Sequence, residues 1–431
     1  MQNNKNENNC FINVLIHSFS HFPLFQTMIL TALNTNTFTN YALIQQLALI
    51  LQQYKELTTN DNPHVLNSLN FRNELASYFN SKGMFGLHEK GDPTELLSFM
   101  LNCLHSIFFK PTDLNVDNSD KLCNSKCISH KLFYIGIEET QRCIQCQNYK
   151  QFLYDNNYFI YEIYVENVIS VLIEEKAKYD VFKHKLILLY KILSEKELQY
   201  CATYKQHTMK RQLKCRALGD YLIFNCIYND NSHLSMLYFL IGKYVELNEM
   251  FYNDNNNVDN KRYSLVGMTL YWGSHYVCVF YEKEINEYVI YDDTNLNHYK
   301  TWKDLVIYLV KNSYYPVLLF YQQVEPQQNE CESEFDLSEA LYSQLNAFEN
   351  ERNKNALKQY NDFMSNCTDN ENAWPCEQCG NVNSYDIFQC MKCQSVNQIV
   401  YEFVKQNHMN NRFVLFAKCA EIFIFRKESK T

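Results

Sequence analysis

The sequence contains one possible catalytic set of a cysteine, a histidine and an aspartate, namely Cys10, His275 and Asp292. Cys10 opens the segment CFINVLIHSF, which has an apolar face at helical spacing and follows Asn8 and Asn9, two candidate helix caps. The partial positive charge at a helix N-terminus favours the thiolate, which is the reactive form of cysteine. Free cysteines are also often buried for packing alone, so position by itself leaves both interpretations open.

A base and an orienting acid lie much further along the chain. His275 directly precedes the apolar run YVCVFY, and Asp292 ends the next run, EYVIYD, at a spacing that suits a strand, a turn and a strand. In such a set the thiolate attacks a carbonyl carbon, the imidazole moves the proton and the carboxylate orients the ring. A structural histidine, and a turn formed by Asp292 and Asp293, are the alternatives.

The predicted secondary structure around these residues changes along the chain from helices to strands. Residues 1–110 show helical apolar periodicity, which is strongest over 41–54 and 93–109. Residues 120–323 contain runs rich in β-branched and aromatic side chains, which predict strands. Helices followed by an antiparallel sheet predict an α+β fold.

The composition limits the functional classes. The chain has 431 residues, of which 46% are apolar, and a formal net charge of −9. It has no basic stripe that would suit nucleic acid, and no run near the roughly 20 apolar residues of a membrane span. The start, MQNNKNENN, lacks a signal-peptide core, and many of the 17 cysteines form C-x2-C pairs. These features favour a reducing compartment, cytoplasmic or nuclear.

Four segments, in order, resemble the ubiquitin-specific proteases, which are also called ubiquitin carboxyl-terminal hydrolases. NNCFINVLIHSFSHFPLF resembles their cysteine box, and GDPTELLSFMLNCLHSIF resembles the next box, with Gly91, Asp92 and Glu95 in register. CISHKLFYIGIEETQRCIQC resembles the branch of the family that contains peptidases 53 and 54. The stretch from YSLVGMTLYWGSHYVCVFY through EYVIYDD to TWKDLVIYLVKNSYYPVLLFY resembles the histidine box.

The resemblance implies a papain-like fold with thumb, palm and fingers over residues 1–323. It implies Cys10 as the nucleophile, His275 as the base and Asp292 as the orienting acid, with Asp293 at a second acidic position that helps the oxyanion site. The implied reaction is hydrolysis of the (iso)peptide bond after the C-terminal glycine of ubiquitin. Ubiquitin and ubiquitinated proteins are the implied partners, and acidic residues would pair with the arginines of the ubiquitin tail.

The family also uses an asparagine upstream of the nucleophile as an oxyanion donor. The usual spacing lands on Lys5, whereas the longer loop of the 53/54 branch lands on Asn3, which we expect to be the donor. Asn4 and Asn8 are alternatives, and the Gly-Leu pair that usually precedes this asparagine is missing. An active protease and a catalytically weak or inactive ubiquitin-binding scaffold are both compatible with these residues.

One predicted zinc site lies in the expected fingers. Cys143-x2-Cys146 is half of a tetrahedral site, and Cys201 with His207 could complete it as a Cys3His set. The site could equally have lost its metal, because a second close cysteine pair is missing there.

Cys123-x3-Cys127-x2-His130 is a further possible ligand set whose fourth ligand is not evident. Packed side chains near the palm are an equal alternative for these three residues.

A second predicted zinc site is compact and lies near the C-terminus. Its pattern is W-x-C-x2-C-x3-N-x6-C-x2-C, formed by Trp374, Cys376, Cys379, Asn383, Cys390 and Cys393. The pattern resembles the Ran-binding-protein type zinc finger, in which zinc supplies the folding energy. Ubiquitin-binding fingers of this type carry Thr-Phe where this chain has Gly380-Asn381, so the resemblance favours zinc and does not favour ubiquitin binding here.

The sequence predicts four parts. They are a catalytic domain over 1–323, an acidic, partly helical linker over 324–371, the zinc finger over 372–396 and a tail over 397–431. Helical composition over 335–363 predicts a solvated or partner-binding helix within the linker.

Overall fold

A computed structural model gives the fold. The described residues are 1, 3, 7–58, 66–79, 84–108, 126–153, 158–174, 185–196, 198–228, 233–251, 261–273, 275–325, 337–367, 373–375 and 382–384. No described helix combines the length and the apolar composition that crossing a membrane would need.

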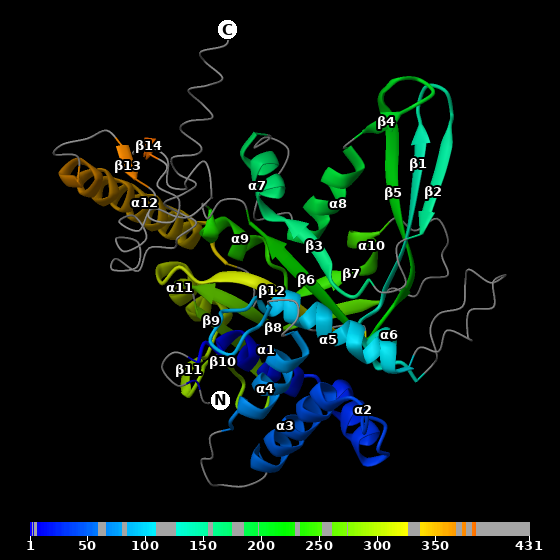
Figure 1. The fold of residues 1–431 in the computed structure, drawn as a ribbon. Helices are drawn as coiled ribbons and strands as arrows, with labels where there is room; N and C mark the ends of the chain where they lie inside the picture. The colour runs from blue at the N-terminus through cyan, green and yellow to red at the C-terminus, as the bar shows by residue number, and fades with distance from the viewer. Residues whose placement is uncertain are drawn as a thin grey trace.

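Helices near the N-terminus form one lobe, the thumb, which lies below the sheets in Figure 1. It contains α1 (Cys10–Ser20), α2 (Pro23–Asn34), α3 (Ala42–Thr58), α4 (Leu69–Phe79) and α5 (Pro93–Phe108). Every residue of α1 from Cys10 to Phe19 is buried, because apolar side chains cover most of its circumference. The first catalytic candidate therefore begins the most enclosed helix of the lobe.

The palm is a sheet in the strand order β11-β10-β9-β8-β12-β6-β3, with β7 paired to β8. Its strands are β3 (Tyr161–Tyr164), β6 (Tyr221–Ile227), β7 (Tyr244–Glu246), β8 (Arg262–Trp272), β9 (His275–Glu282), β10 (Glu287–Asp292), β11 (Asn295–Tyr299) and β12 (Tyr315–Val324). Successive side chains point to opposite faces: Cys278 and Phe280 pack on the thumb core, whereas Val277 and Val279 pack on a second core. The sheet thus separates two hydrophobic cores.

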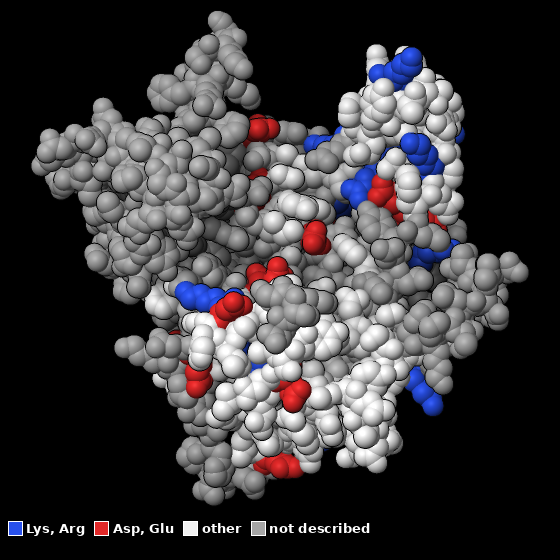
Figure 2. Space-filling view, in the orientation of Figure 1, with Lys and Arg blue, Asp and Glu red and all other residues white. Residues whose placement is uncertain are grey.

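The fingers are a second sheet that projects from the rest of the molecule at the upper right of Figure 1. Its strand order is β2-β1-β5-β4, formed by β1 (Ile135–Cys143), β2 (Tyr149–Leu153), β4 (Gln199–Cys201) and β5 (Gln206–Leu218). The short helix α6 (Ile128–Phe133) leads from the thumb into β1. Figure 2 shows Lys and Arg side chains over this projection and acidic side chains across the middle of the same face.

Further helices pack around the second core. They are α7 (Val165–Glu174), α8 (Leu186–Lys196), α9 (Leu234–Leu240), α10 (Leu247–Met250) and α11 (Trp302–Lys311). The helix predicted over 335–363 is present as α12 (Glu339–Cys367). One face of its first half is packed on the protein and the rest is exposed, because Leu341 and Leu345 are buried in this core and α12 contacts α9 and α11.

Two short strands lie in the predicted zinc finger. β13 (Ala373–Pro375) pairs antiparallel with β14 (Val382–Ser384), which places Trp374 opposite Asn383. The four predicted ligands, Cys376, Cys379, Cys390 and Cys393, and the tail over 397–431 lie outside the described residues. Zinc binding by this finger therefore stays a prediction.

Candidate active site

Helix α1 carries Cys10 as its first residue. Asn9 is the N-cap residue, and its carbonyl accepts the backbone N–H groups of Ile12 and Asn13, both at 2.9 Å. The Asn9 side chain makes no capping hydrogen bond, so a side-chain cap from this residue is not formed. The Cys10 residue is 7% exposed, which places its thiol just beneath the surface, at the positive end of the helix dipole.

His275 and Asp292 lie on neighbouring strands of the palm. β9 begins at His275 and β10 ends at Asp292, and the two strands pair antiparallel, with Tyr291 opposite Cys278. The His275 Nε2 atom donates a hydrogen bond to Asp292 Oδ1 at 2.7 Å. The meeting of these two residues across a hairpin is therefore confirmed, and the carboxylate orients the ring through Nε2.

Cys10 acts electrostatically on the His275 ring, so its side chain lies near the pair that His275 forms with Asp292. Burial alone lowers the pKa of His275, but the hydrogen bonds and charges of Asp292 and Cys10 outweigh it and raise the pKa to about 10. The ring is then an imidazolium at neutral pH, and an imidazolium favours the thiolate form of a neighbouring cysteine. Because Asp292 holds Nε2, Nδ1 is the ring nitrogen left for the sulfur.

Asp293 follows in a turn and faces the start of α1. Its φ of 51° is a left-handed conformation that aspartate tolerates in turns. Its Oδ2 accepts the Asn3 amide at 2.8 Å, and its Oδ1 accepts the Asn13 amide at 2.9 Å. The His275 Nε2 atom is 3.9 Å from Asp293 Oδ2, so Asp292 orients the ring and Asp293 gathers the two asparagines.

Asn3 contacts the residue that precedes the nucleophile. Its Oδ1 accepts the backbone N–H of Asn9 at 3.0 Å, and its amide nitrogen carries a second N–H beyond the one given to Asp293. Asn8 instead donates to the carbonyl of His88 at 2.7 Å, and Asn4 lies outside the described residues. Of the two described candidates for the oxyanion donor, Asn3 is the one that the structure joins to the catalytic group.

Asn13 is a site residue that the sequence reasoning missed. It is 2% exposed, and its Oδ1 accepts the hydroxyl of Ser68 at 3.1 Å while its nitrogen donates to Asp293. The available signal was a polar residue almost one turn after Cys10 on an otherwise apolar helix. Asn13 ties the turn at the end of β10 to the nucleophile helix.

Phe11, which follows Cys10, is held in place by contacts with Arg72 and Gly91. The Arg72 guanidinium lies 5.0 Å from the centre of the Phe11 ring, and it donates to the carbonyls of Gly86 and Glu89. A Cβ at Gly91 would lie 2.5 Å from the Phe11 ring, a distance that only glycine avoids. The loop that leads into α5 is thereby held against the start of α1.

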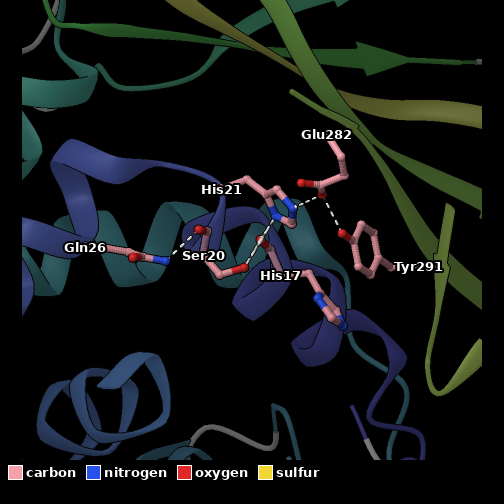
Figure 3. A network of polar contacts seen from close by, with 6 residues as sticks. All are labelled: His17, Ser20, His21, Gln26, Glu282 and Tyr291. Carbon is pink, nitrogen blue, oxygen red and sulfur yellow. Dashed lines mark hydrogen bonds and ion pairs between the residues drawn. The ribbon is translucent and has the colours of Figure 1, made fainter. Parts of the chain in front are cut away.

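A polar network joins the far end of α1 to β9 and β10, the strands of His275 and Asp292 (Figure 3). His21 follows α1, and its Nδ1 donates to the carbonyl of His17 while its Nε2 donates to Glu282 Oε1, both at 2.6 Å. Tyr291 of β10 donates its hydroxyl to the same Glu282 oxygen. Glu282 ends β9, so one carboxylate connects the helix of Cys10 with the strands of His275 and Asp292.

His17 supports this network through its ring. It lies between two tyrosines, with ring centroids 5.8 Å from Tyr54 and 4.8 Å from Tyr291. Burial, together with the positive charges of the N-terminal amine and His21, lowers the pKa of His17 well below 6.5. A neutral ring therefore packs on Tyr291 and restrains its hydroxyl toward Glu282.

We expect Glu282→Gln to lower the free energy of unfolding by about 2 kcal/mol at pH 7, because hydrogen bonds to a charged group are lost. Burial alone raises the pKa of Glu282, but the bonds and charge of His21 and the hydroxyl of Tyr291 outweigh it and lower the pKa below 4.5. The carboxylate therefore stabilises the fold above pH 4.5, and this contribution is lost as the pH falls through the lowered pKa.

Urea unfolding of both proteins over this pH range measures the difference. The exposed Glu284 on the adjoining turn supplies the control, and Glu284→Gln should change the free energy by less than about 0.5 kcal/mol. A gap between wild type and Glu282→Gln that stays constant from pH 7 to pH 4 would argue against the network.

A cleft of about 720 Å³ separates the thumb from the palm. Three carboxylates line it, from Asp92, Glu95 and Glu162, and much of its remaining wall is aromatic, from Phe79, Phe85, Phe99, Tyr228, Tyr271, Tyr276 and Tyr315. Tyr276 directly follows His275, so the cleft extends to the catalytic strand. Asp92 Oδ1 accepts the backbone N–H of Thr94 at 2.6 Å, whereas Glu95 and Glu162 are exposed to solvent.

Three of the predicted fingers ligands converge at the end of the projecting sheet. The ligand atoms of Cys143, Cys146 and Cys201 lie within 4.8 Å of one another. The Cys143 sulfur accepts the backbone N–H of Cys146, and the Cys201 sulfur accepts that of Tyr204, both at 3.4 Å. Burial raises the pKa of Cys143, but this N–H group and the Thr208 hydroxyl outweigh it and lower the pKa to about 6. Thiolate character and two facing knuckles suit zinc.

His207, the predicted fourth ligand, lies outside this group. Its side chain is exposed, and its Nδ1 donates to the carbonyl of Leu198 at 3.1 Å. His207 pairs with Tyr200 in the register of β5 and β4, and this register directs its ring toward the Tyr200 ring. Tyr204 stands three residues after Cys201, where a C-x2-C knuckle would carry its second cysteine. The structure thus assembles three thiols without the imidazole.

Comparison with known proteins agrees with this arrangement. The chain matches the family described as ubiquitin carboxyl-terminal hydrolase over residues 2–321. It is 23% identical to the mouse protein ubiquitin carboxyl-terminal hydrolase 54 over 332 residues, which cover 74% of this chain and 20% of that protein. It is 22% identical to the human ubiquitin carboxyl-terminal hydrolase 53 over 329 residues, which cover 74% of this chain and 29% of that protein. The chain therefore spans well under half the length of these relatives.

Solved structures show the same fold. One is the SAGA Ubp8/Sgf11/Sus1/Sgf73 DUB module bound to ubiquitin aldehyde, with a TM-score of 0.52 at 15% identity over 74% of this chain and 68% of that chain. Another is the module with Ubp8(C146A) bound to monoubiquitin, with a TM-score of 0.51 at 15% identity over the same shares. The α+β, papain-like architecture is thereby confirmed, and the chain belongs to the ubiquitin carboxyl-terminal hydrolase family.

Proposed function

We propose that this chain is a deubiquitinating cysteine protease, which hydrolyses the (iso)peptide bond after the C-terminal glycine of ubiquitin. The observation that carries the proposal is that Cys10, at the start of α1, lies near the hydrogen-bonded pair of His275 and Asp292. Membership of the family supports ubiquitin as the partner. The structures of related folds bound to ubiquitin aldehyde and to monoubiquitin support it further.

The geometry supports a two-step mechanism. The Cys10 thiolate attacks the carbonyl carbon of the terminal glycine, and the His275 imidazolium gives its proton to the departing amine, which leaves a thioester on Cys10. Neutral His275 then takes a proton from water as the water attacks the thioester, and Cys10 leaves as the thiolate beside the imidazolium. The carboxylic acid of the released ubiquitin gives its proton to solvent and becomes a carboxylate. Asp292 keeps the ring oriented and stabilises its charged form in both steps.

The negative charge that develops on the glycine oxygen needs hydrogen-bond donors. We propose the backbone N–H of Cys10 and the second amide hydrogen of Asn3 as these donors. Asp293 holds the Asn3 amide at 2.8 Å and so acts on catalysis through Asn3, not through the histidine.

The cleft suits the extended tail of ubiquitin. Its aromatic walls would pack against a narrow segment of backbone, and the exposed Glu95 of the thumb and Glu162 of the palm both line it. Arginine side chains of the ubiquitin tail would pair with these carboxylates. Asp92 is less suited to this role, because its side chain already caps α5.

Glu95→Gln and Glu162→Gln are each expected to raise the KM for a ubiquitin substrate about fivefold and to leave kcat nearly unchanged. Each removes a partly exposed ion pair with the tail, which contributes about 1 kcal/mol. Steady-state hydrolysis of a fluorogenic ubiquitin amide measures both constants. Glu284→Gln is the control, because it removes the same charge at an exposed position that does not line the cleft. An unchanged KM in both variants would show that the tail does not bind between these carboxylates.

We also propose zinc as a structural cofactor. The C-terminal finger would hold it with Cys376, Cys379, Cys390 and Cys393, and the fingers with Cys143, Cys146 and Cys201, whose sulfurs converge as described. Bound zinc would cross-link the two knuckles of each unit. The abundance of cysteine in C-x2-C pairs supports a cytoplasmic or nuclear location.

Turnover separates a protease from a ubiquitin-binding scaffold of the same fold. We expect the wild-type chain to hydrolyse a fluorogenic ubiquitin amide, and Cys10→Ala to bind ubiquitin without hydrolysing it. Ubiquitin binding with no turnover by the wild-type chain would favour the scaffold.

A further inference from the structure

A second cluster of metal-binding side chains lies between the thumb and the fingers, away from the catalytic group. It consists of His105 near the end of α5, Cys127 at the N-cap of α6 and His130 in the first turn of α6. All three are buried, with Cys127 fully so. The Ser129 hydroxyl donates to the carbonyl of Leu101 at 2.6 Å, which locks α6 against α5 beside the cluster.

The separations within this cluster match those around a tetrahedral metal. The Cys127 sulfur lies 3.6 Å from His105 Nδ1 and 3.4 Å from His130 Nδ1, and the three ligand atoms lie within 4.8 Å of one another. With Zn–S bonds of about 2.3 Å and Zn–N bonds of about 2.1 Å, tetrahedral angles place sulfur and nitrogen ligands about 3.6 Å apart. Zinc would therefore fit between the three atoms with little rearrangement.

The chemistry of the three donors points to the same ion. One thiolate and two imidazoles suit zinc, whereas magnesium and calcium require oxygen ligands. Both imidazole rings turn Nδ1 toward the same sulfur, as ligands of one shared metal ion would. The surroundings are apolar, with Leu101, Leu104 and Phe159 in the same core, and converging polar groups in such a core are costly unless they are paired.

From these observations we propose that His105, Cys127 and His130 are ligands of a structural zinc ion that joins α5 to α6. The site is distinct from the three thiols of the fingers and from the C-terminal finger. Since α6 leads directly into β1, zinc here fixes the base of the fingers to the thumb. The fourth ligand position is not assigned, and Cys123, which precedes the cluster in the sequence, lies outside the described residues.

Zinc content per chain, measured by elemental mass spectrometry on the purified full-length protein, tests the site. We expect Cys127→Ser to carry one equivalent less than wild type. Cys103→Ser is the matched control, because Cys103 lies two residues before His105 on α5 but outside the cluster, and it should lose none. Equal zinc in wild type and Cys127→Ser would overturn the proposal, as would an equal loss in Cys103→Ser.

Two further measurements do not depend on how well Cys127→Ser folds. His130→Cys offers a thiolate in place of the imidazole and should keep the zinc equivalent that His130→Ala loses. In crystals of the wild-type protein, an anomalous difference peak at the zinc absorption edge is expected among the three side chains. A crystal that shows zinc at the other sites and no peak here would overturn the proposal.

Discussion

Asp292→Asn lowers the kcat for a ubiquitin amide by about 10³-fold to 10⁴-fold, with little change in KM, if the carboxylate orients His275 as the structure indicates. The substitution preserves the shape of the side chain but removes its negative charge. In the wild type the charged Asp292 accepts the hydrogen bond of His275 Nε2 through Oδ1 at 2.7 Å. Without this acceptor the imidazolium loses its stabilisation, and the neutral ring no longer presents a fixed nitrogen to Cys10. Steady-state kinetics with a fluorogenic ubiquitin amide measures the loss.

The pKa of His275 distinguishes this role from a general loss of structure. In the wild type the hydrogen bonds and charges of Asp292 and Cys10 overcome burial and raise the pKa to about 10. Asp292→Asn removes a large part of this stabilisation, so the pKa should fall toward 6.5 or below. Because the amine leaving group needs the imidazolium, activity on the amide should decline at a lower pH than in the wild type. Titration of the ring by nuclear magnetic resonance measures the pKa directly.

Asp293→Asn is the matched control. Asp293 lies 3.9 Å from His275 Nε2 and bonds to Asn3 and Asn13 instead. This variant should leave the pKa of His275 close to its wild-type value and lower kcat by a smaller factor, because it loosens Asn3, the proposed oxyanion donor. A larger fall in the His275 pKa for Asp293→Asn than for Asp292→Asn would reverse the roles assigned to the two residues.

Glu349→Ala should lower the free energy of unfolding by about 3 kcal/mol. Glu349 on α12 is 1% exposed, and its carboxylate accepts the backbone N–H groups of Leu234 at 2.6 Å and Ser235 at 2.9 Å. It also accepts the Ser235 hydroxyl at 2.7 Å. Alanine leaves these donors at the start of α9 buried without a partner, which is among the costliest effects of a single substitution.

Urea denaturation of Glu349→Ala and Glu351→Ala tests this assignment on the same helix. Glu351 is exposed, so its replacement should change the free energy by less than about 0.5 kcal/mol. A chain that ends at residue 323 lacks α12 altogether and should be destabilised at least as much as Glu349→Ala. Similar effects of the two substitutions would mean that α12 does not stabilise the catalytic unit.

The sequence predicted those parts of the site that depend on local pattern. Cys10 begins a helix because apolar periodicity starts there, and His275 and Asp292 meet because two apolar runs are joined by a short turn. Both features are encoded within about 20 residues of chain. The helix of the acidic segment was predicted for the same reason, although its packing was not.

Contacts between distant segments could not be predicted. His21 meets Glu282 across 261 positions, and Glu349 meets Ser235 across 114. Charged residues at these positions look like ordinary surface residues in the sequence, because only the tertiary fold shows that they are paired and at least partly buried. His105 is similar, since it joins Cys127 only when α5 packs on α6.

Strand register explains why His207, a predicted zinc ligand, lies away from the three thiols of the fingers. Cys201 and His207 are close in sequence, which made a shared zinc site plausible. Because side chains of a strand alternate between faces, the direction of His207 depends on how β5 pairs with β4, and the observed pairing sets its ring beside Tyr200. Spacing alone carries no information about that register.

The most direct measurement is to react the full chain with ubiquitin whose C-terminus carries an electrophile and to map the adduct by peptide mass spectrometry. We predict a single modified residue, Cys10, among the 17 cysteines, and no adduct in the Cys10→Ala variant. An adduct at another cysteine, or a chain that binds ubiquitin and stays unmodified, would contradict a catalytic role for Cys10 with His275 and Asp292.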